Sequence, residues 1–207
     1  MHSQTIVLPL LALAAFLGAI RAAESETATK ATIEAPSPDG QFAFRYSTKA
    51  DGERKSYDLI EKKSGRVLTS VAESDPDLGP SGRFNMEVLW RPDSKAFALT
   101  ATFWKRGSEV IIYQRAGAAF REVKIPELLA EIPDKIKRGK EFPHVVELNS
   151  QSAIRWLKDG TVVVEIESIE DGNGSSITAT RTVTLSFDQS GKAKASKSSV
   201  KYAKGDE

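Results

Sequence analysis

The stretch RPDSKAFALT, Arg91 to Thr100, joins a tight turn to a strand and decides the fold. Pro92 fixes the backbone at the first central position of a type I turn, and Asp93 can bond back to its own backbone. Uncharged residues then occupy every position of the strand, so neither of its faces carries a charge. We therefore expect this strand to be covered on both sides.

Two other stretches have the same order of turn and strand, SPDGQFAFRY at residues 37–46 and LKDGTVVVEI at residues 157–166. Each opens the second strand of a run of four short strands joined by turns, and strands linked this tightly pair as antiparallel neighbours. The sequence thus predicts three four-stranded units, at about residues 32–72, 85–125 and 152–202.

The outer two units differ from the middle one. Their second strands alternate large apolar residues with charged ones, which gives each strand one wetter face. A middle unit flanked by two terminal units has this profile, whereas all units of a closed ring should share one profile. Three units are also too few for a ring, because propellers use at least about four. We expect an all-β chain with a minor helix, three consecutive antiparallel meanders in an open or partial propeller, with a β-sandwich as the alternative.

The segments LWRPDSKAFAL and SPDGQFAF resemble the W-S-P-D-G-K core of the WD40-like repeats in bacterial periplasmic propellers of the TolB type. Trp90 and Trp156 each lie three positions before the turn aspartate, as in that pattern, whereas the first unit has Pro36 there. The resemblance implies a propeller-like scaffold that serves as an interaction platform. The turn-to-turn spacings of 54 and 66 residues exceed the 40 to 45 of a typical blade.

The extra residues that lengthen the spacing between the second and third units include the segment PELLAEIPDKIK. Pro126 suits a first helical position, and Leu128, Ile132 and Ile136 follow at four-residue spacing. This spacing predicts a helical insertion at about residues 126–137, bent or interrupted at its internal proline.

The N-terminus carries an apolar run, IVLPLLALAAFLGAI, that is short for a membrane span and ends in small residues. We interpret residues 1–22 as a signal peptide, with an uncleaved anchor as the alternative. Residues 23–31 then form a flexible leader, 32–203 a single domain and 204–207 a polar tail. The expected location is the periplasm or the extracellular space, with no membrane contact after cleavage.

Composition narrows the range of partners. Loss of Arg21 with the signal leaves 28 basic and 28 acidic residues, so no global field favours nucleic acid. The basic cluster at residues 135–140 has no interleaved aromatic residues, which indicates a solvated connector. No cysteine is present, so the domain has no disulfide framework. We expect no cofactor.

Candidates for chemistry are few. His144 is the only histidine after the signal and lies beside a proline, which indicates a connector residue and leaves too few ligands for a histidine or cysteine zinc site. Glu165 and Glu167 lie two residues apart on one strand, about 7 Å. A glycosidase needs its two carboxylates on opposite sides of a sugar, so a solvated strand face is the better interpretation. We predict no catalytic residue and no metal ligand.

In EDGNGSS, Asp171, Asn173 and Ser175 fall at the first, third and fifth positions of an EF-hand-like loop. Ser176 replaces the glycine and Thr182 the bidentate glutamate of that motif, which favours a plain hairpin loop.

Contact with a partner is the remaining use for such loops. Trp90 and Trp156 have apolar neighbours, which favours core packing. Trp104, Lys105 and Arg106 lie together in a hairpin loop and are our contact candidates, with Asp171 and Asn173 in the other loop. We expect these five residues to contact a partner and to have no catalytic or metal-binding role.

Lysines at 192, 194 and 197 line the last strand, a known guard against aggregation at a sheet edge. This strand should therefore be an exposed edge of the third unit.

Three functional hypotheses follow. The first is a secreted or periplasmic non-catalytic module that binds an envelope protein, another secreted protein or a glycan through its loops. The second is a carboxylate- or metal-dependent hydrolase that uses acids of the loops TKADGER and EDGNGSS. The third is a homodimer in which three units meet three to complete a propeller.

Overall fold

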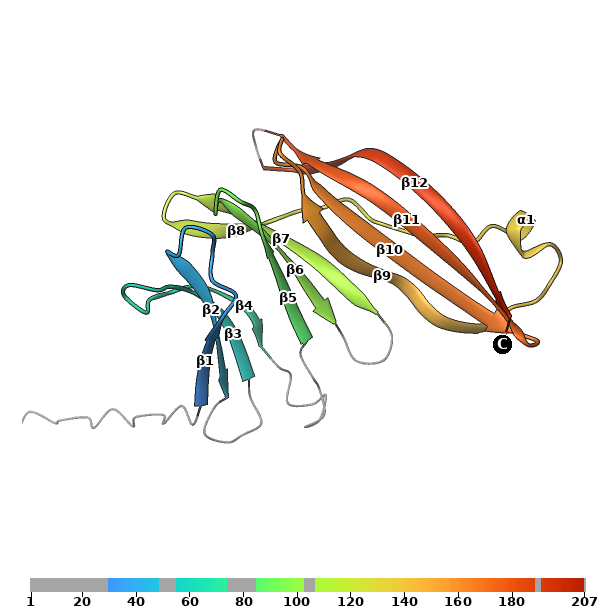
Figure 1. The fold of residues 1–207 in the computed structure, drawn as a ribbon, viewed down its shortest axis with the longest axis horizontal. Coiled ribbons are helices and arrows are strands. Elements are labelled where there is room, and N and C mark those ends of the chain that lie inside the picture. Colours follow the sequence, from blue (N-terminus) through green and yellow to red (C-terminus); the bar gives the residue numbers. More distant parts are fainter. Residues whose placement is uncertain (1–29, 49–54, 74–84, 103–106, 189–190, 207) are drawn as a thin grey trace, which may run out of the picture.

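The computed structural model describes residues 30–48, 55–73, 85–102, 107–188 and 191–206. Within these ranges the chain forms twelve β-strands and one short helix. The strands make three separate four-stranded antiparallel sheets that follow one another in chain order (Figure 1). The open, propeller-like all-β fold is confirmed, and the chain does not form the two-sheet sandwich.

We call the three sheets units 1, 2 and 3. The strands of unit 1 are β1 (Lys30–Glu34), β2 (Phe42–Thr48), β3 (Lys55–Glu61) and β4 (Val67–Glu73). The strands of unit 2 are β5 (Asn85–Trp90), β6 (Ala96–Thr102), β7 (Ser108–Ala116) and β8 (Ala119–Val123). The strands of unit 3 are β9 (His144–Trp156), β10 (Val162–Gly172), β11 (Ser175–Phe187) and β12 (Ala193–Asp206). In each sheet the hydrogen-bonded neighbours are also sequence neighbours, so every unit is a meander.

The middle strand of the stack is covered on both sides, as expected. Every residue of β6 before Thr102 is buried. Phe97 and Leu99 belong to the core shared with unit 1, whereas Ala98 belongs to the core shared with unit 3. Because successive side chains of a strand point to opposite faces, one strand serves both cores.

The core between units 1 and 2 is aromatic. Phe44 packs edge-on against Phe97 with ring centroids 5.1 Å apart, and Trp90 lies 5.0 Å from Phe97. Tyr57 and Tyr113 stack on the two phenylalanines at 4.9 Å. Such offset and edge-on pairs add about 0.5–1.5 kcal/mol each beyond their buried area.

The core between units 2 and 3 is mostly aliphatic. Its fully buried members include Ile112 from β7, Val162 and Val164 from β10 and Val183 from β11. Trp156 packs against its edge near Phe187. Aromatic side chains therefore hold units 1 and 2 together, and mostly aliphatic side chains hold units 2 and 3 together.

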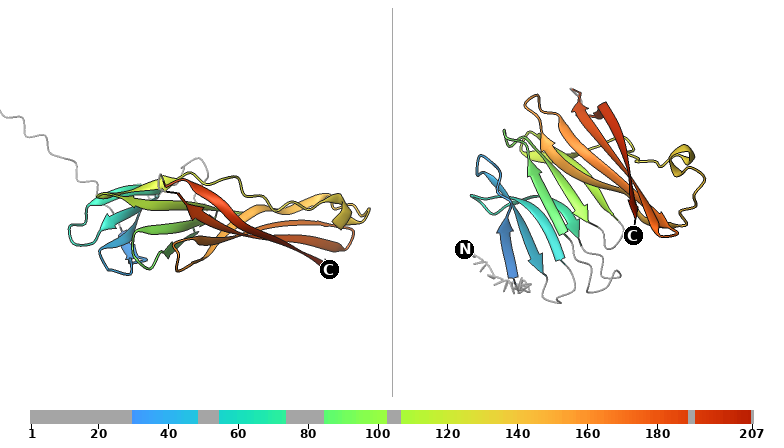
Figure 2. Two further views of the ribbon diagram at one scale, coloured as in Figure 1. Left: turned by 90° about the horizontal axis from the view of Figure 1, so that it is seen from above. Right: turned by 45° about the vertical axis from the view of Figure 1, so that its right-hand side comes forward.

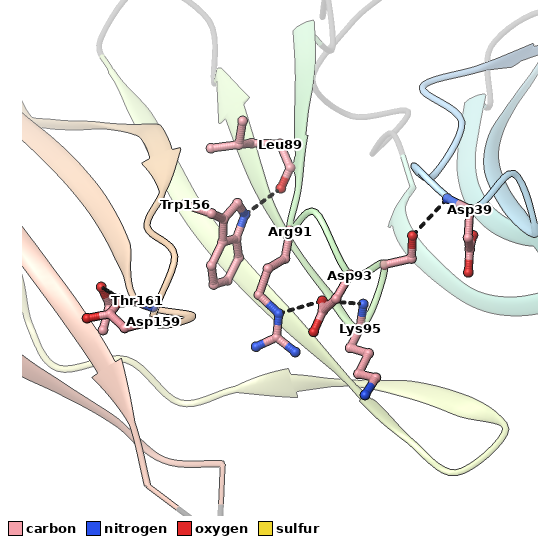
Figure 3. A network of polar contacts seen from close by, with 9 residues as sticks. Asp39, Leu89, Arg91, Asp93, Lys95, Trp156, Asp159 and Thr161 are labelled. Atoms are coloured by element: carbon pink, nitrogen blue, oxygen red, sulfur yellow. Dashed lines mark hydrogen bonds and ion pairs between the residues drawn. The ribbon is translucent and has the colours of Figure 1, made fainter.

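One hydrogen bond is common to both interfaces. The indole Nε1 of Trp156 donates to the carbonyl oxygen of Leu89 at 2.9 Å (Figure 3), and that of Trp90 donates to the carbonyl oxygen of Ala35 at 2.9 Å. Pro36, Trp90 and Trp156 occupy the same position in the three units. Ala35 and Leu89, the two acceptors, are the residues directly before that position in units 1 and 2. Each tryptophan thus fastens its own unit to the preceding one. Both tryptophans also pack against the cores, as we expected from their apolar neighbours.

The turn aspartates also have a shared role. The Asp93 carboxylate accepts from the Arg91 side chain at 2.7 Å and from the Lys95 backbone N–H at 3.0 Å (Figure 3). The Asp159 carboxylate accepts from the hydroxyl and the backbone N–H of Thr161, and these bonds hold its pKa below the ordinary value. Partial burial opposes the hydrogen bonds to Asp93, yet the net effect also lowers its pKa. The aspartates stabilise turns, as the sequence indicates.

Both ends of the stack present polar sheet faces. On unit 1, Arg45 and Asp58 alternate with core residues and form an ion pair of 3.3 Å. On unit 3, the β11 residues that alternate with the buried ones are serines and threonines, from Ser176 to Ser186. Terminal units of a stack need such polar outer faces for solubility.

The connector between units 2 and 3 corrects one expectation. The helix spans only Asp134–Lys137, instead of residues 126–137. Before it, Leu128, Ala130 and Ile132 are buried and alternate with more exposed neighbours, which is the two-residue period of an extended chain. The residue before a proline disfavours helical geometry, so Pro133 keeps this segment extended. We call residues 124–133 the strap.

Unit 3 is longer than the sequence boundaries indicate. β9 begins at His144, and β12 continues to Asp206 where we expected a tail. β1 likewise begins at Lys30, inside the expected leader. The far ends of the strands of unit 3 therefore extend beyond unit 2, and α1 lies beside them (Figure 2).

Candidate functional site

The predicted contact loops have different outcomes. Residues 103–106, which include Trp104, Lys105 and Arg106, lie outside the described residues, as do residues 49–54 of the loop TKADGER. Asp171 and Asn173 lie at the hairpin that joins β10 to β11. Residues 1–29, which include the expected signal peptide and most of the expected leader, are also outside the described part of the chain.

The β10–β11 hairpin has a two-residue turn. Asn173 and Gly174 both have positive φ, 55° and 70°, and Gly172 pairs with Ser175 across the turn. Two successive residues with positive φ define a type I′ turn, for which Asn-Gly is the preferred sequence. EDGNGSS is therefore a tight hairpin.

The side chains of Asp171 and Asn173 are not arranged as metal ligands. The Asn173 side-chain amide donates to the Glu141 carbonyl at 3.5 Å, and one oxygen of Asp171 is buried without a hydrogen-bond partner. Among the described residues, no group of three or more histidine or acidic side chains could hold a metal ion. No helix in the same part of the chain is long and apolar enough to cross a membrane.

A hollow lies farther back on the same sheet, between the strap and the first half of β9. Its volume is about 360 Å³. Its apolar lining consists of four aliphatic residues: Leu129, Ile132, Val145 and Leu148. Its charged lining consists of three acids: Glu131, Glu147 and Glu170. Together with Ala130, Asn149 and Ser168 we call this surface the β9 groove.

The wall of the groove is shaped by two irregularities in β9. Ser150 pairs with Glu167 and Glu147 pairs with Ile169, so two residues of β9, Leu148 and Asn149, stand opposite one residue of β10. Asn149 has a φ of 51°, the left-handed conformation expected at such a bulge. A second extra residue, Val146, follows. Bulges re-aim side chains, and both of these are at the groove.

Three apolar side chains in the first half of β9 are exposed to solvent. The exposed fractions are 54% for Val145, 43% for Val146 and 65% for Leu148. β9 is the last strand of its sheet, so no strand pairs with it on the side away from β10. This is a concentration of exposed aliphatic surface on an edge strand, where charges are the usual protection.

Hydrogen bonds fix the floor of the groove. The Asn149 side-chain oxygen accepts from the Ala130 backbone N–H at 2.8 Å, and the Ser168 hydroxyl accepts from the Asn149 backbone N–H at 3.0 Å. The Arg181 guanidinium donates to the Leu129 carbonyl at 2.8 Å. The strap is thus tied to the sheet from both sides of the hollow, which makes the groove a preformed surface.

The charge of the groove is negative. Glu170 forms an ion pair of 2.7 Å with Lys137 of α1, which offsets its charge. Glu131 is exposed, Glu147 is half-exposed, and neither forms an ion pair within the described residues. No basic side chain lines the hollow. The groove therefore combines aliphatic contact surface with uncompensated carboxylates.

Glu165 and Glu167 lie outside the groove, on the outer face of unit 3. Partial burial and the nearby carboxylates of Glu147 and Glu165 raise the pKa of Glu167. Both residues alternate with buried Val164 and Ile166, as expected for a solvated strand face. The raised pKa of Glu167 therefore reports partial burial first and crowding of like charges second.

Sequence reasoning placed the contact surface on loops and missed the β9 groove. His144, which we expected in a connector, is the exposed first residue of β9 and pairs with Asp171. The usable signal was the run HVVEL, which places β-branched residues in a segment without glycine. The prediction that the lysine-rich last strand is an exposed edge is confirmed: β12 is an edge strand, and Lys194 and Lys197 are exposed.

Comparison of the sequence with protein-family models and with curated proteins finds no match in either.

Proposed function

We propose that the protein is a secreted or periplasmic, non-catalytic interaction module that binds another protein at the β9 groove. The observation that carries this proposal is the row of exposed aliphatic side chains, Val145, Val146 and Leu148, beside a preformed hollow. Burying apolar surface is the main favourable term in protein association, about 25 cal/mol per Å². The open stack supplies a rigid support for that surface.

The two edges of the unit 3 sheet support this interpretation. β12 carries Lys194, Lys197 and Lys201, which oppose edge-to-edge pairing. The first half of β9 carries aliphatic side chains in the corresponding exposed positions. β12 also exposes Val200 and Tyr202, but lysines stand beside them, so the first half of β9 is the more apolar of the two edges.

The lining favours a protein over a glycan. Carbohydrate faces are held by aromatic platforms, because an aromatic ring is a large, rigid apolar surface with a polarised π-face. The groove is lined by aliphatic and acidic residues and by no aromatic one. Aliphatic side chains of a partner protein fit such a surface better.

Secretion is part of the same proposal. The apolar N-terminal run with small residues at its end supports export, and the absence of cysteine from the sequence is compatible with an oxidising compartment. Export is tested by the mass of the protein recovered from the periplasm or the medium, which should correspond to removal of about the first 22 residues.

Site-specific photo-crosslinking tests the binding site. Benzoylphenylalanine replaces Leu148 in the full chain, and in a matched control it replaces Val200, an exposed aliphatic residue on β12 of the same sheet. After irradiation in the producing cells, we expect a discrete adduct from position 148 and none from position 200. The adduct should disappear when Val146→Ser is added, and its attached mass should be sensitive to protease.

Three results would contradict the proposal. Equal adducts at both positions would mean nonspecific contact, and no adduct at position 148 would mean that nothing occupies the groove. An attached mass that resists protease but is removed by periodate oxidation would identify a glycan as the ligand.

A further inference from the structure

From the charge and shape of the groove we infer its occupant: a protein segment with a lysine or arginine side chain between aliphatic ones, lying across β9. This inference rests on the proposed function and specifies the partner. It commits to side-chain contacts across the edge of the sheet, and it does not extend the sheet by another strand.

Charge complementarity specifies the basic side chain. The groove presents Glu131 and Glu147 without an ion-pair partner among the described residues, and Lys137 offsets only Glu170. An apolar segment alone would desolvate these carboxylates without compensation, which costs free energy. A cationic side chain with a long aliphatic stem can cover the apolar wall while its charged end reaches a carboxylate.

The aliphatic rim specifies what lies beside that cation. Val145 and Leu148 line the hollow, and Val146 lies between them on the exposed edge. Aliphatic neighbours in the partner would remove these three side chains from water. The apolar surface then supplies affinity, and the charge pair supplies selectivity and a faster encounter.

The bulges in β9 exclude simple strand addition. An added strand needs a regular succession of backbone N–H and carbonyl groups along the edge. Between Val145 and Ser150 the ladder with β10 is interrupted twice, so the free edge does not offer that succession. Bulged edges are one of the ways in which proteins avoid pairing with another sheet.

The same charges oppose a symmetric dimer at this surface. In a two-fold contact each residue meets its own surroundings in the other copy, so Glu131 and Glu147 of one chain would face the same acids. Like charges in a closing interface are unfavourable by several kcal/mol. A partner of opposite charge avoids this repulsion.

Selection from a random peptide library displayed on phage tests the inference directly. The full chain is the target, and Leu148→Ser serves for counter-selection, so that only peptides dependent on the groove remain. We expect the selected peptides to carry lysine or arginine flanked by leucine, isoleucine or valine. Synthetic copies of two selected peptides then provide dissociation constants by fluorescence anisotropy.

Neutralising the acids provides the decisive measurement. Glu147→Gln and Glu131→Gln should each weaken peptide binding by about tenfold, because a charge-assisted hydrogen bond is replaced by a neutral one. Glu122→Gln is the matched control, since it removes the same charge from an exposed position of unit 2, outside the groove, and should change binding less than twofold. Higher salt should weaken wild-type binding more than that of the Glu147→Gln protein.

The outcomes separate the two proposals. Groove-dependent peptides without a basic residue, or unchanged binding by both glutamine variants, overturn the inferred partner chemistry and leave the interaction module in place. A concentration-dependent dimer that Leu148→Ser abolishes overturns the inference in favour of self-association. Failure to obtain any peptide that depends on Leu148 counts against both the partner chemistry and the groove as a binding site for protein segments.

Discussion

The four strands of unit 3 are covered differently at their two ends. The near half, around Trp156, Val164 and Val183, packs against a whole sheet of unit 2. Among the described residues, the far half, around Val145 and Ile177, is covered by the strap, by α1 and by residues 138–143, where Phe142 is buried. The same strands therefore serve as core at one end and as a partly open surface at the other.

The difference teaches what a single extended segment can cover. The strap buries Leu128, Ala130 and Ile132 over the middle strands, and with them Ile166 and Ile177. One segment has too little width to reach the edge at β9 as well, so Leu148 stays exposed. The groove is the boundary of what the connector covers. Seven substitutions, in four comparisons, test whether the two halves differ as this description requires.

The largest effect is expected in the near half. Val164→Ala removes two methyl groups from a fully buried position and should lower the free energy of unfolding by about 2 kcal/mol. Chemical denaturation measures it. Val145→Ala in the far half, where the side chain is exposed, should cost less than about 0.5 kcal/mol. Similar losses at both sites would contradict the division into halves.

A smaller effect is expected for the link that joins the near half to unit 2. Trp156→Phe keeps most of the ring but loses the N–H that donates to the Leu89 carbonyl, so the cost should be about 1 kcal/mol. Trp90→Phe removes the equivalent bond to Ala35 and should cost a similar amount. Denaturation midpoints of both variants, with an unchanged denaturant slope, check this prediction.

The pH dependence of stability should distinguish the outer face of the sheet, because Glu167 lies there. Because the pKa of Glu167 is raised in the folded state, stability falls as the pH rises from its ordinary value of 4.5 through the raised value. Glu167→Gln should therefore raise the melting temperature at pH 7.5 by about 1–2 °C and have no effect below pH 4. Glu109→Gln, on an exposed position of unit 2, is the matched control for the loss of one carboxylate.

The smallest effect on stability is expected in the groove itself. Leu148→Ser alters a side chain that is 65% exposed, so the free energy of unfolding should change by less than about 0.5 kcal/mol. The variant should elute earlier from a hydrophobic-interaction column, because surface apolar area is lost. A large loss of stability would show that Leu148 is part of the core, and would remove the basis of the binding proposal.

The sequence was informative where burial has a period. Uncharged residues at every position of β6 predict coverage on both sides, and the structure confirms it. Alternation in β2 and β10 predicts one wetter face, and the charged residues Arg45, Glu165 and Glu167 are indeed only partly buried. Ala43 and Val163, on the same faces, are buried. These patterns depend on neighbouring residues alone, so they survive without knowledge of the tertiary arrangement.

The sequence was misleading where two periods coincide. Leu128 and Ile132 are four residues apart, which fits one face of a helix, but they are also an even number apart, which fits one face of an extended chain. Buried Ala130 decides for the second, and alanine is too common in helices to have indicated it. The resemblance to WD40-like repeats stays a prediction.

The groove could not be predicted because it depends on register. Leu148 is exposed since β9 has one residue more than β10 between two pairs, and nothing local in HVVELNS specifies that mismatch. The strap that forms the opposite wall is separate in sequence. Only the folded chain brings the two together.

The tryptophan links give the stack a direction. Each indole reaches back to a unit made earlier, and unit 1, with Pro36 at the corresponding position, reaches back to nothing among the described residues. Synthesis delivers the N-terminus first, so each of these acceptor carbonyls precedes its donor in time. Each sheet can then form as it emerges and fasten to the completed sheet before it, and the two tryptophan links of the described residues do not have to wait for the C-terminus.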